Sequence, residues 1–164
     1  MKNQLAKVVD KLNKKPKWIR SWLLDFALGS TIKFVGTAGI NCQLLSQNKA
    51  VFKLKNKKKV RNHIGNVHAA AISLLAETAS GLLLGMNVPD NKIPRLKSMK
   101  VEYLKSSVGD LTAVATISQQ QLEQLHQVEK GDFVIEVEIT DSSSQLPVQC
   151  EMCWAWVDKN SLYR

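Results

Sequence analysis

The longest apolar stretch of the chain, residues 67–86, constrains the fold more than any other feature. Apolar side chains lie on nearly every side of such a helix, which is typical of a helix buried on most sides. The stretch is about long enough to cross a bilayer, but Glu77 lies near its middle. A charge there costs roughly 2.5–3.5 kcal/mol even on insertion scales. The sequence therefore predicts a buried central helix, with Asn66 as its N-cap.

Strands are predicted on both sides of this helix. Before it, residues 32–46 predict a strand or strand pair with glycine interruptions, and residues 50–59 place Phe52 and Leu54 on one face. After it, apolar and polar side chains alternate in four segments separated by turn signals, residues 98–103, 111–117, 133–140 and 148–156. We expect an α+β fold in which an antiparallel sheet wraps the central helix.

Two helices are expected ahead of the sheet. Residues 3–13 have apolar side chains at helical spacing, and Pro16 suits the first turn of a second helix that Gly29 ends. This second helix has one apolar stripe, made of Trp18, Ile19, Trp22, Leu23 and Phe26. Packing on the protein's own sheet is the favoured interpretation, and contact with a membrane as a basic amphipathic unit is the alternative. We divide the chain into an N-terminal helical extension, residues 1–29, and a main domain, residues 30–164.

The net charge of +9 is unevenly distributed. Residues 1–61 have 15 Lys and Arg against 2 Asp and Glu, or +13, whereas residues 62–164 have 8 against 12, or −4. A basic half indicates an anionic partner. Lys59 and Arg61 belong to a basic run that either binds the phosphates of CoA or protects a solvated strand edge. No nucleic acid is expected, because the run lacks interleaved aromatic residues and a recognisable reader motif.

Three cysteines, an odd number, indicate a reducing compartment, so we expect a cytoplasmic protein. Cys150 and Cys153 have the spacing of a metal or redox pair, but in a predicted strand their side chains face opposite ways. A metal site would need two further ligands, and no metal or redox cofactor is implied. His126 lies in a predicted Gln-rich turn, without a companion for a serine–histidine–acid arrangement.

The central helix and the loop before it also contain the side chains that could take part in catalysis. A buried carboxylate such as that of Glu77 needs partners, a raised pKa or a water-filled site, and it is then usable as a general base. His68 lies at the helix start, where the backbone N–H groups of Ala69 and Ala70 can hold an oxyanion. Asn62 can orient a water molecule or a neighbouring side chain.

Spacing along the helix predicts the assembly. Nine residues separate His68 from Glu77, or about 13.5 Å of helix, so the two cannot reach one carbonyl within a single helix. If both act in one reaction, two such helices lie antiparallel, one from each subunit of a two-fold dimer. Ser73, one turn before Glu77, either hydrogen-bonds its carboxylate or bonds back to its own helix.

The run from Asn62 to Gly81 resembles the signature of hotdog-fold acyl-CoA thioesterases of the phenylacetyl-CoA-thioesterase type. That signature has Asn, Gly three residues on, His six on, two small residues, and an acid nine residues after the His, followed by Ala and Gly. Asn62, Gly65, His68, Glu77 and Gly81 fall in register with it. The strand order also fits over roughly residues 30–158, and the N-terminal extension is similar to that of a poorly characterised branch.

This resemblance implies an α+β hotdog fold, assembled as a homodimer or dimer of dimers, that hydrolyses an acyl-CoA or related thioester at a site shared by two subunits. Glu77 would then be the base or nucleophile, Ala69 the backbone donor to the oxyanion, and His68 and Asn62 the groups that position the reactants. Substrate-binding positions would be Gly65, Ser73, Ser98, Arg61 and Lys59. Ser98 is the nearest match to a Ser or Thr that the family often has in the strand after the helix.

Two departures from the family pattern keep other functions open. Ala69-Ala70 replaces a frequent Gly-Gly pair, and Glu77 replaces a frequent Asp. A non-catalytic module that binds acyl thioesters or lipids, peripheral to a membrane through its basic N-terminal helices, is the first alternative. A polyanion-binding protein is the second, and its affinity would fall steeply with salt.

Overall fold

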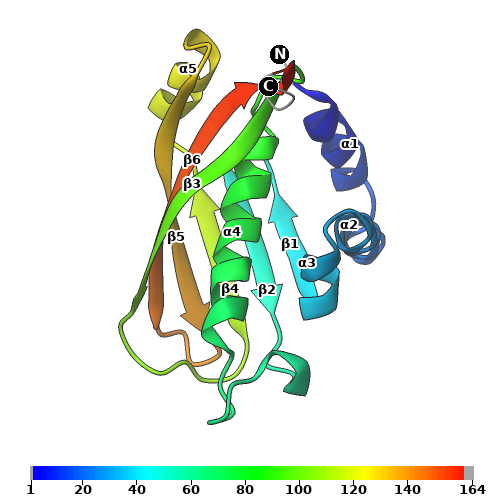
Figure 1. The fold of residues 1–164 in the computed structure, drawn as a ribbon. Helices are drawn as coiled ribbons and strands as arrows, with labels where there is room; N and C mark the ends of the chain where they lie inside the picture. Colours follow the sequence, from blue (N-terminus) through cyan, green and yellow to red (C-terminus); the bar gives the residue numbers. More distant parts are fainter. Residues whose placement is uncertain (1, 161–164) are drawn as a thin grey trace.

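The computed structural model describes residues 2–160 and consists of a six-stranded antiparallel sheet curved around one long helix (Figure 1). The strand order in the sheet is β1-β2-β4-β5-β6-β3. Along the chain the elements are α1 (Gln4–Asn13), α2 (Lys17–Thr31), α3 (Lys33–Ala38), β1 (Ile40–Leu45), β2 (Lys49–Leu54), the 3₁₀ turn η1 (Lys58–Val60), α4 (Ala69–Gly85), β3 (Lys92–Tyr103), β4 (Leu111–Thr116), α5 (Gln119–Gln127), β5 (Gly131–Asp141) and β6 (Val148–Asp158).

The core lies between α4 and the concave face of the sheet. Leu75, Leu83 and Leu84 of α4 are fully buried, as are Phe52 and Leu54 of β2. Each such side chain contributes roughly 1.5–3 kcal/mol when it leaves water, which explains why the most apolar helix occupies the centre. The predicted α+β hotdog fold, with its sheet wrapped around a central helix, is confirmed.

Two segments differ from the sequence prediction. Residues 33–38 form the short helix α3 and not a strand, and Gly39, with φ of 77°, is its left-handed C-cap. The Gln-rich segment predicted as a turn forms α5, which Ser118 and Gln121 start with reciprocal capping hydrogen bonds. His126 therefore lies in the last turn of a helix.

Gly29 does not end α2, which continues to Thr31, and Pro16 takes the N-cap position. Instead, Gly29 allows α2 and α3 to touch through their backbones. A Cβ added at Gly36 would lie 2.9 Å from the Cα of Gly29. The helical segment thus runs to Ala38 and shares one core with the sheet, while the division at residue 29 stays a prediction.

The second helix turns its aromatic residues outward. Trp18, Trp22 and Phe26 are 75%, 65% and 66% exposed, whereas Leu24 and Leu28 are buried. The expectation that the apolar stripe packs on the protein's own sheet is therefore wrong for its three aromatic members.

Polar contacts between α2 and β1 explain this orientation. The carboxylate of Asp25 accepts the backbone N–H of Cys42 at 2.7 Å, and Ser21 Oγ donates to the Cys42 carbonyl at 3.2 Å. Arg20 donates to the carbonyl of Gln43 at 3.2 Å. These bonds satisfy three backbone groups on the outer edge of β1, and they hold the polar and leucine side of α2 against the sheet.

At the other end of the sheet, the outer edge of β3 has no strand partner within residues 2–160. The sheet therefore has one closed edge and one open edge. In the part of the chain that the structure describes, no helix combines the length and the hydropathy needed to span a bilayer.

Candidate active site

The start of α4 is capped by His68 and not by Asn66. The Nδ1 atom of His68 accepts the backbone N–H of Ala70 at 3.1 Å, so a neutral imidazole has its proton on Nε2. This bond occupies one of the two backbone donors expected at the helix start. Within residues 2–160 the N–H of Ala69 has no acceptor, so Ala69 is the open donor at this end of the helix dipole.

A tight loop leads into this helix start. The side-chain oxygen of Asn62 accepts the backbone N–H groups of Ile64 at 3.1 Å and Asn66 at 3.0 Å. Gly65 adopts a φ of 86°, which an L side chain rarely tolerates. The backbone N–H of His68 then donates to the carbonyl of Val60 at 2.8 Å. Asn62 and Gly65 thus shape the loop that positions His68.

Glu77 lies two and a half turns further along α4, half-buried, on the wall of an apolar trough with a volume of about 460 Å³. It is the one charged side chain among the described residues that line this trough. Its carboxylate makes no hydrogen bond or ion pair with another residue of the described chain. The half-buried side chain of Glu77 therefore keeps contact with solvent.

The walls of the trough come from distant parts of the chain. Leu5 of α1 and Val35 of α3 form one side, and Pro94 of β3 and Trp154 of β6 form the other. Sequence reasoning missed these residues, since only tertiary packing brings them together. Gly81, one turn after Glu77, was the available signal, because a small residue there indicates a close neighbour.

The predicted serines are not at the trough. Ser73 Oγ donates to the Ala69 carbonyl at 3.2 Å, so it bonds back to its own helix. Ser98 pairs with Cys153 after a bulge between Leu96 and Ser98. It shares the outer face of the sheet with Lys100, away from α4, because side chains alternate along a strand. Within one subunit the structure does not bring Ser98 to Glu77.

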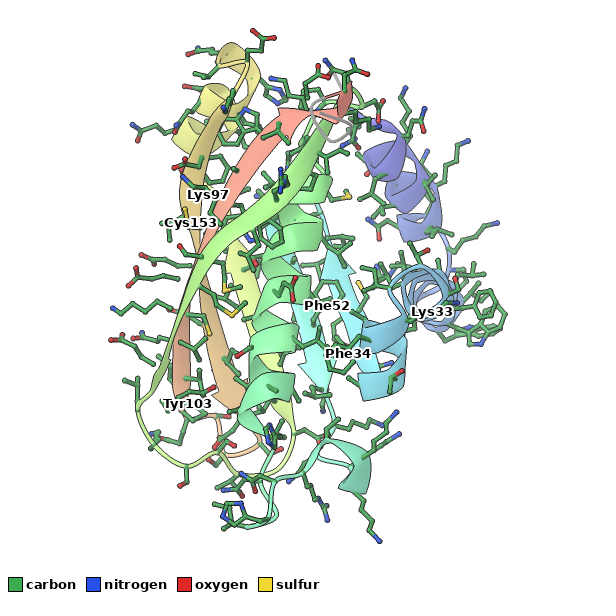
Figure 2. All side chains as sticks on the ribbon, in the orientation of Figure 1. Lys33, Phe34, Phe52, Lys97, Tyr103 and Cys153 are labelled. Carbon is green, nitrogen blue, oxygen red and sulfur yellow. The ribbon has the colours of Figure 1, made fainter. Side chains whose placement is uncertain are left out.

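Tyr103, which sequence reasoning did not select, does reach the helix start. It lies at the end of β3 on the face that looks toward α4 (Figure 2). Its hydroxyl lies 3.4 Å from the carbonyl of Ala69.

The basic residues gather at the same end of α4 as His68. Arg61 is held by Asn56, whose side-chain and backbone oxygens accept from its guanidinium at 2.9 Å each. Lys59 is exposed in η1, two residues before Arg61. The strand-edge interpretation of the basic run is wrong, because β2 lies inside the sheet between β1 and β4.

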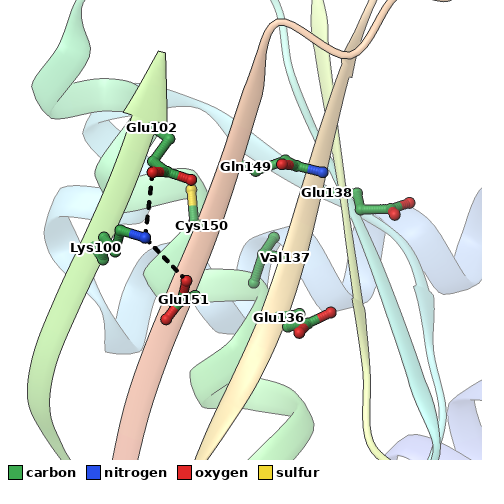
Figure 3. Close-up of a pocket in the computed structure, with 8 residues that line it drawn as sticks. All are labelled: Lys100, Glu102, Glu136, Val137, Glu138, Gln149, Cys150 and Glu151. Atoms are coloured by element: carbon green, nitrogen blue, oxygen red, sulfur yellow. Dashed lines mark hydrogen bonds and ion pairs between the residues drawn. The ribbon is translucent and has the colours of Figure 1, made fainter. Parts of the chain in front are cut away.

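The outer face of the sheet has a shallow hollow of different character (Figure 3). Lys100 lies 3.2 Å from carboxylate oxygens of both Glu102 and Glu151, and Glu136 and Glu138 stand alongside. These side chains are exposed, and together they are acidic. An anionic ligand is therefore disfavoured on this face, in contrast to the α4 side.

The two halves of the predicted site stay apart within one subunit. Asn62, Gly65, His68 and Ala69 lie at the start of α4 with Lys59 and Arg61. Glu77 lies about 13.5 Å along the same helix, as nine residues require.

Three solved structures have the same fold. PA5026 of Pseudomonas aeruginosa, a protein of unknown function named a "Probable Thioesterase", has a TM-score of 0.75 and 21% identity, covering 82% of this chain and 94% of that one. The thioesterase HI1161 of Haemophilus influenzae has a TM-score of 0.68 and 15% identity, over 82% and 88%. A mutant of the thioesterase SAV0944 of Staphylococcus aureus has a TM-score of 0.66 and 21% identity, over 76% and 98%.

No curated protein matches the chain. The model of one family, "Domain of unknown function (DUF4442)", matches residues 20–157. Since this match covers most of the sequence, the chain belongs to the DUF4442 family, and its fold is the hotdog fold of the thioesterases.

Proposed function

We propose that this protein hydrolyses the thioester bond of an acyl-CoA, or a related acyl thioester, at a site shared between two subunits. The observation that carries the proposal is the position of Glu77, a half-buried carboxylate that is the one charged group of an apolar trough. A trough of this volume falls within the range of small-molecule sites, roughly 300–1,000 Å³. Its apolar walls suit the acyl chain, and Glu77 suits the reacting end.

The open edge of β3 supports the assembly that this chemistry needs. Two β3 edges that pair antiparallel across a two-fold axis give one continuous sheet, and the two α4 helices then run antiparallel on the same side. Glu77 of one subunit would approach Ala69 of the other. The closed β1 edge leaves β3 as the edge available for such pairing. The proposed assembly is a homodimer or a dimer of dimers.

In the proposed reaction, Glu77 takes a proton from water while the water oxygen bonds to the thioester carbon. The carbonyl electrons move to its oxygen, and the Ala69 N–H of the other subunit stabilises this oxyanion. When the carbonyl re-forms, the carbon–sulfur bond breaks and the thiolate leaves, taking up the proton from Glu77 or solvent. Asn62 and His68 position the helix start that supplies the donor.

The basic residues beside the helix start complete the proposal. Lys59 and the Asn56-held guanidinium of Arg61 would bind the phosphates of CoA. The carrier would thus lie at one end of α4 and the acyl chain in the trough of the neighbouring subunit. Three unpaired cysteines support a reducing, cytoplasmic setting for this reaction.

Release of free thiol from short, medium, long and aromatic acyl-CoAs tests the proposal. We expect turnover that Glu77→Gln reduces by about 10²–10⁴-fold, the range for loss of a general base. Glu138→Gln is the matched control, because Glu138 is an exposed carboxylate on the opposite face. Turnover that survives Glu77→Gln contradicts the assignment of the base.

A non-catalytic acyl-thioester or lipid-binding module is the alternative. The observation in its favour is the use of the Ala70 N–H by His68, which leaves a single backbone donor for the oxyanion. If no acyl-CoA is hydrolysed, while a folded dimer binds an acyl thioester equally well with and without the Glu77 carboxylate, this alternative replaces the hydrolase.

A further inference from the structure

An aromatic row projects from the outer side of α2. Trp18, Trp22 and Phe26 follow one another at intervals of four residues, so they lie in line along the helix. All three are exposed, and the rings of Trp22 and Phe26 stack with centroids 6.0 Å apart. Single exposed apolar residues are ordinary, but a contiguous patch of this kind marks an interaction site.

The row is not used by the fold or by the proposed active site. The opposite side of α2 packs through Leu24 and Leu28 and bonds the edge of β1 through Ser21 and Asp25. The trough beside Glu77 is lined by α1, α3, α4, β3, β6 and Ile32 at the end of α2, and none of the three aromatic residues lines it. Figure 1 shows α2 on the outside of the molecule, at the opposite side from β3.

The surroundings of the row are basic. Lys14 and Lys15 precede α2, and Lys33 follows it at the start of α3, all three exposed. Figure 2 labels Lys33 beside α2. Residues 1–38 hold eight Lys and Arg against two Asp. Both acids are engaged, Asp10 with Lys2 and Asp25 with the edge of β1. The row therefore lies in a region of strong net positive charge.

We propose that α2 docks the protein on an anionic membrane surface, with the aromatic row in the boundary between headgroups and acyl chains. Tryptophan favours this boundary, because its ring is apolar and its N–H is polar. Flanking lysines are attracted to anionic headgroups within a Debye length of the surface. A helix with one aromatic face and a basic rim lies in the plane of the interface and does not span it.

A second copy of the chain fits the row less well. A two-fold contact through α2 would set Lys14, Lys15 and Lys33 of one copy against the same lysines of the other. Like charges at such a contact repel, whereas anionic headgroups complement both the row and its rim.

Tryptophan emission tests the proposal in the full-length protein. The chain has four tryptophans, and Trp154 and Trp156 are 7% and 0% exposed, so a change on binding reports Trp18 and Trp22. We expect a blue shift and co-sedimentation with vesicles of phosphatidylcholine and phosphatidylglycerol. Both effects weaken in high salt and with vesicles of phosphatidylcholine alone. Absence of a shift and of sedimentation with either vesicle overturns the proposal.

Three sets of variants sharpen the test. Replacing Trp18, Trp22 and Phe26 by Ser weakens vesicle binding by about tenfold or more, read from sedimentation, with unchanged circular dichroism. Ser at Leu104, Val108 and Val134, which are 56%, 60% and 41% exposed elsewhere, is the matched control and binds as the unaltered protein does. Gln at Lys14, Lys15 and Lys33 removes the preference for anionic vesicles.

The same measurements distinguish membrane docking from contact with a second copy of the chain. If the triple Ser variant has a smaller mass in solution, while vesicles leave the unaltered protein unbound, the row is a subunit contact and the membrane proposal fails. These measurements need no turnover, so they do not depend on the proposed hydrolase.

Discussion

The indole of Trp154 lies so close to Gly81 that a Cβ on residue 81 would be 2.8 Å from the ring. The same indole donates to Ser80 Oγ at 3.0 Å, which fixes it across α4. Because the ring also lines the trough beside Glu77, the absence of a side chain at Gly81 determines the shape of that wall.

We predict that Gly81→Ala lowers the free energy of unfolding by about 1–3 kcal/mol, because the added methyl overpacks the site and displaces Trp154. Gly85→Ala, one turn later, is the control. Its Cβ would meet Leu5 at an ordinary 3.4 Å, and Ala gains roughly 0.5–1 kcal/mol over Gly in a helix. Urea unfolding of the two variants measures the difference, and equal stability would contradict the packing argument.

Ala69→Pro should remove the proposed oxyanion donor without disturbing the helix. Ala69 is the first helical residue, a position that Pro tolerates, and His68 before it already has extended backbone angles. We expect turnover to fall by about 10²–10³-fold, with unchanged circular dichroism. Full activity in a folded Ala69→Pro variant would show that the Ala69 N–H takes no part.

Mixing two inactive variants tests whether the site is shared. In a mixed dimer of Glu77→Gln and Ala69→Pro subunits, one site holds both changes and the other holds neither. Random assembly from equal amounts then restores about one quarter of the original activity. As a reference for the recovered activity, a chain with both substitutions is mixed with unaltered chain in the same proportions. No recovery from well-mixed variants would contradict a site that Glu77 and Ala69 share across two subunits.

The cysteines predict a pH effect on stability. Burial raises the pKa of the Cys42 thiol from 9.0 to about 12, with the Asp25 charge adding to the rise. Between these values the folded state holds a proton that the unfolded state has lost, so unfolding becomes easier as pH rises. Burial likewise raises the pKa of Cys150 to about 11.

We expect the unfolding free energy to decline above about pH 9, and Cys42→Ala to decline less steeply over the same range. Thiol labelling of the native protein should modify the half-buried Cys153 first, and all three cysteines only after unfolding. Rapid labelling of Cys42 in the native state would disprove its burial.

Asp25→Ala tests the contact between α2 and the sheet. The substitution leaves the Cys42 N–H without its acceptor, and a buried unsatisfied donor costs about 1–3 kcal/mol. Asp132→Ala is the control, because its ion pair with Lys97 is exposed and should matter little to the unfolding midpoint. Asp25→Ala behaving like Asp132→Ala would exclude a structural role for this bond.

Local patterns predicted most of the fold, since alternation and helical spacing are properties of neighbouring residues. The buried strands and the central helix follow from them. The serine and glutamine that start α5 were visible as a capping pair, but the Gln-rich composition obscured the helix. From the sequence, Gly36 suggested an interruption in a strand. Its real role in α3 is the close contact with Gly29, which is a tertiary feature and cannot be read from neighbouring residues.

The candidate site divides in the same way. The motif from Asn62 to Gly81 placed the helix start and Glu77, which share one helix and its loop. Trp154, Val35 and Tyr103 come from other elements, so no spacing in the sequence could select them. The aromatic row points outward because the opposite side of α2 bonds to the edge of β1. Those hydrogen bonds join residues some twenty positions apart, so local spacing did not predict them.

The unequal edges of the sheet have a consequence for growth. A protein whose sheet has two free edges can add a further copy at each edge, and repeated addition gives a fibre of unlimited length. Within residues 2–160 α2 covers the outer edge of β1, so β3 is the edge left free for a further strand. A pairing of two β3 edges, as proposed above, would therefore stop at two copies, because α2 leaves no second free edge to which a third copy could add.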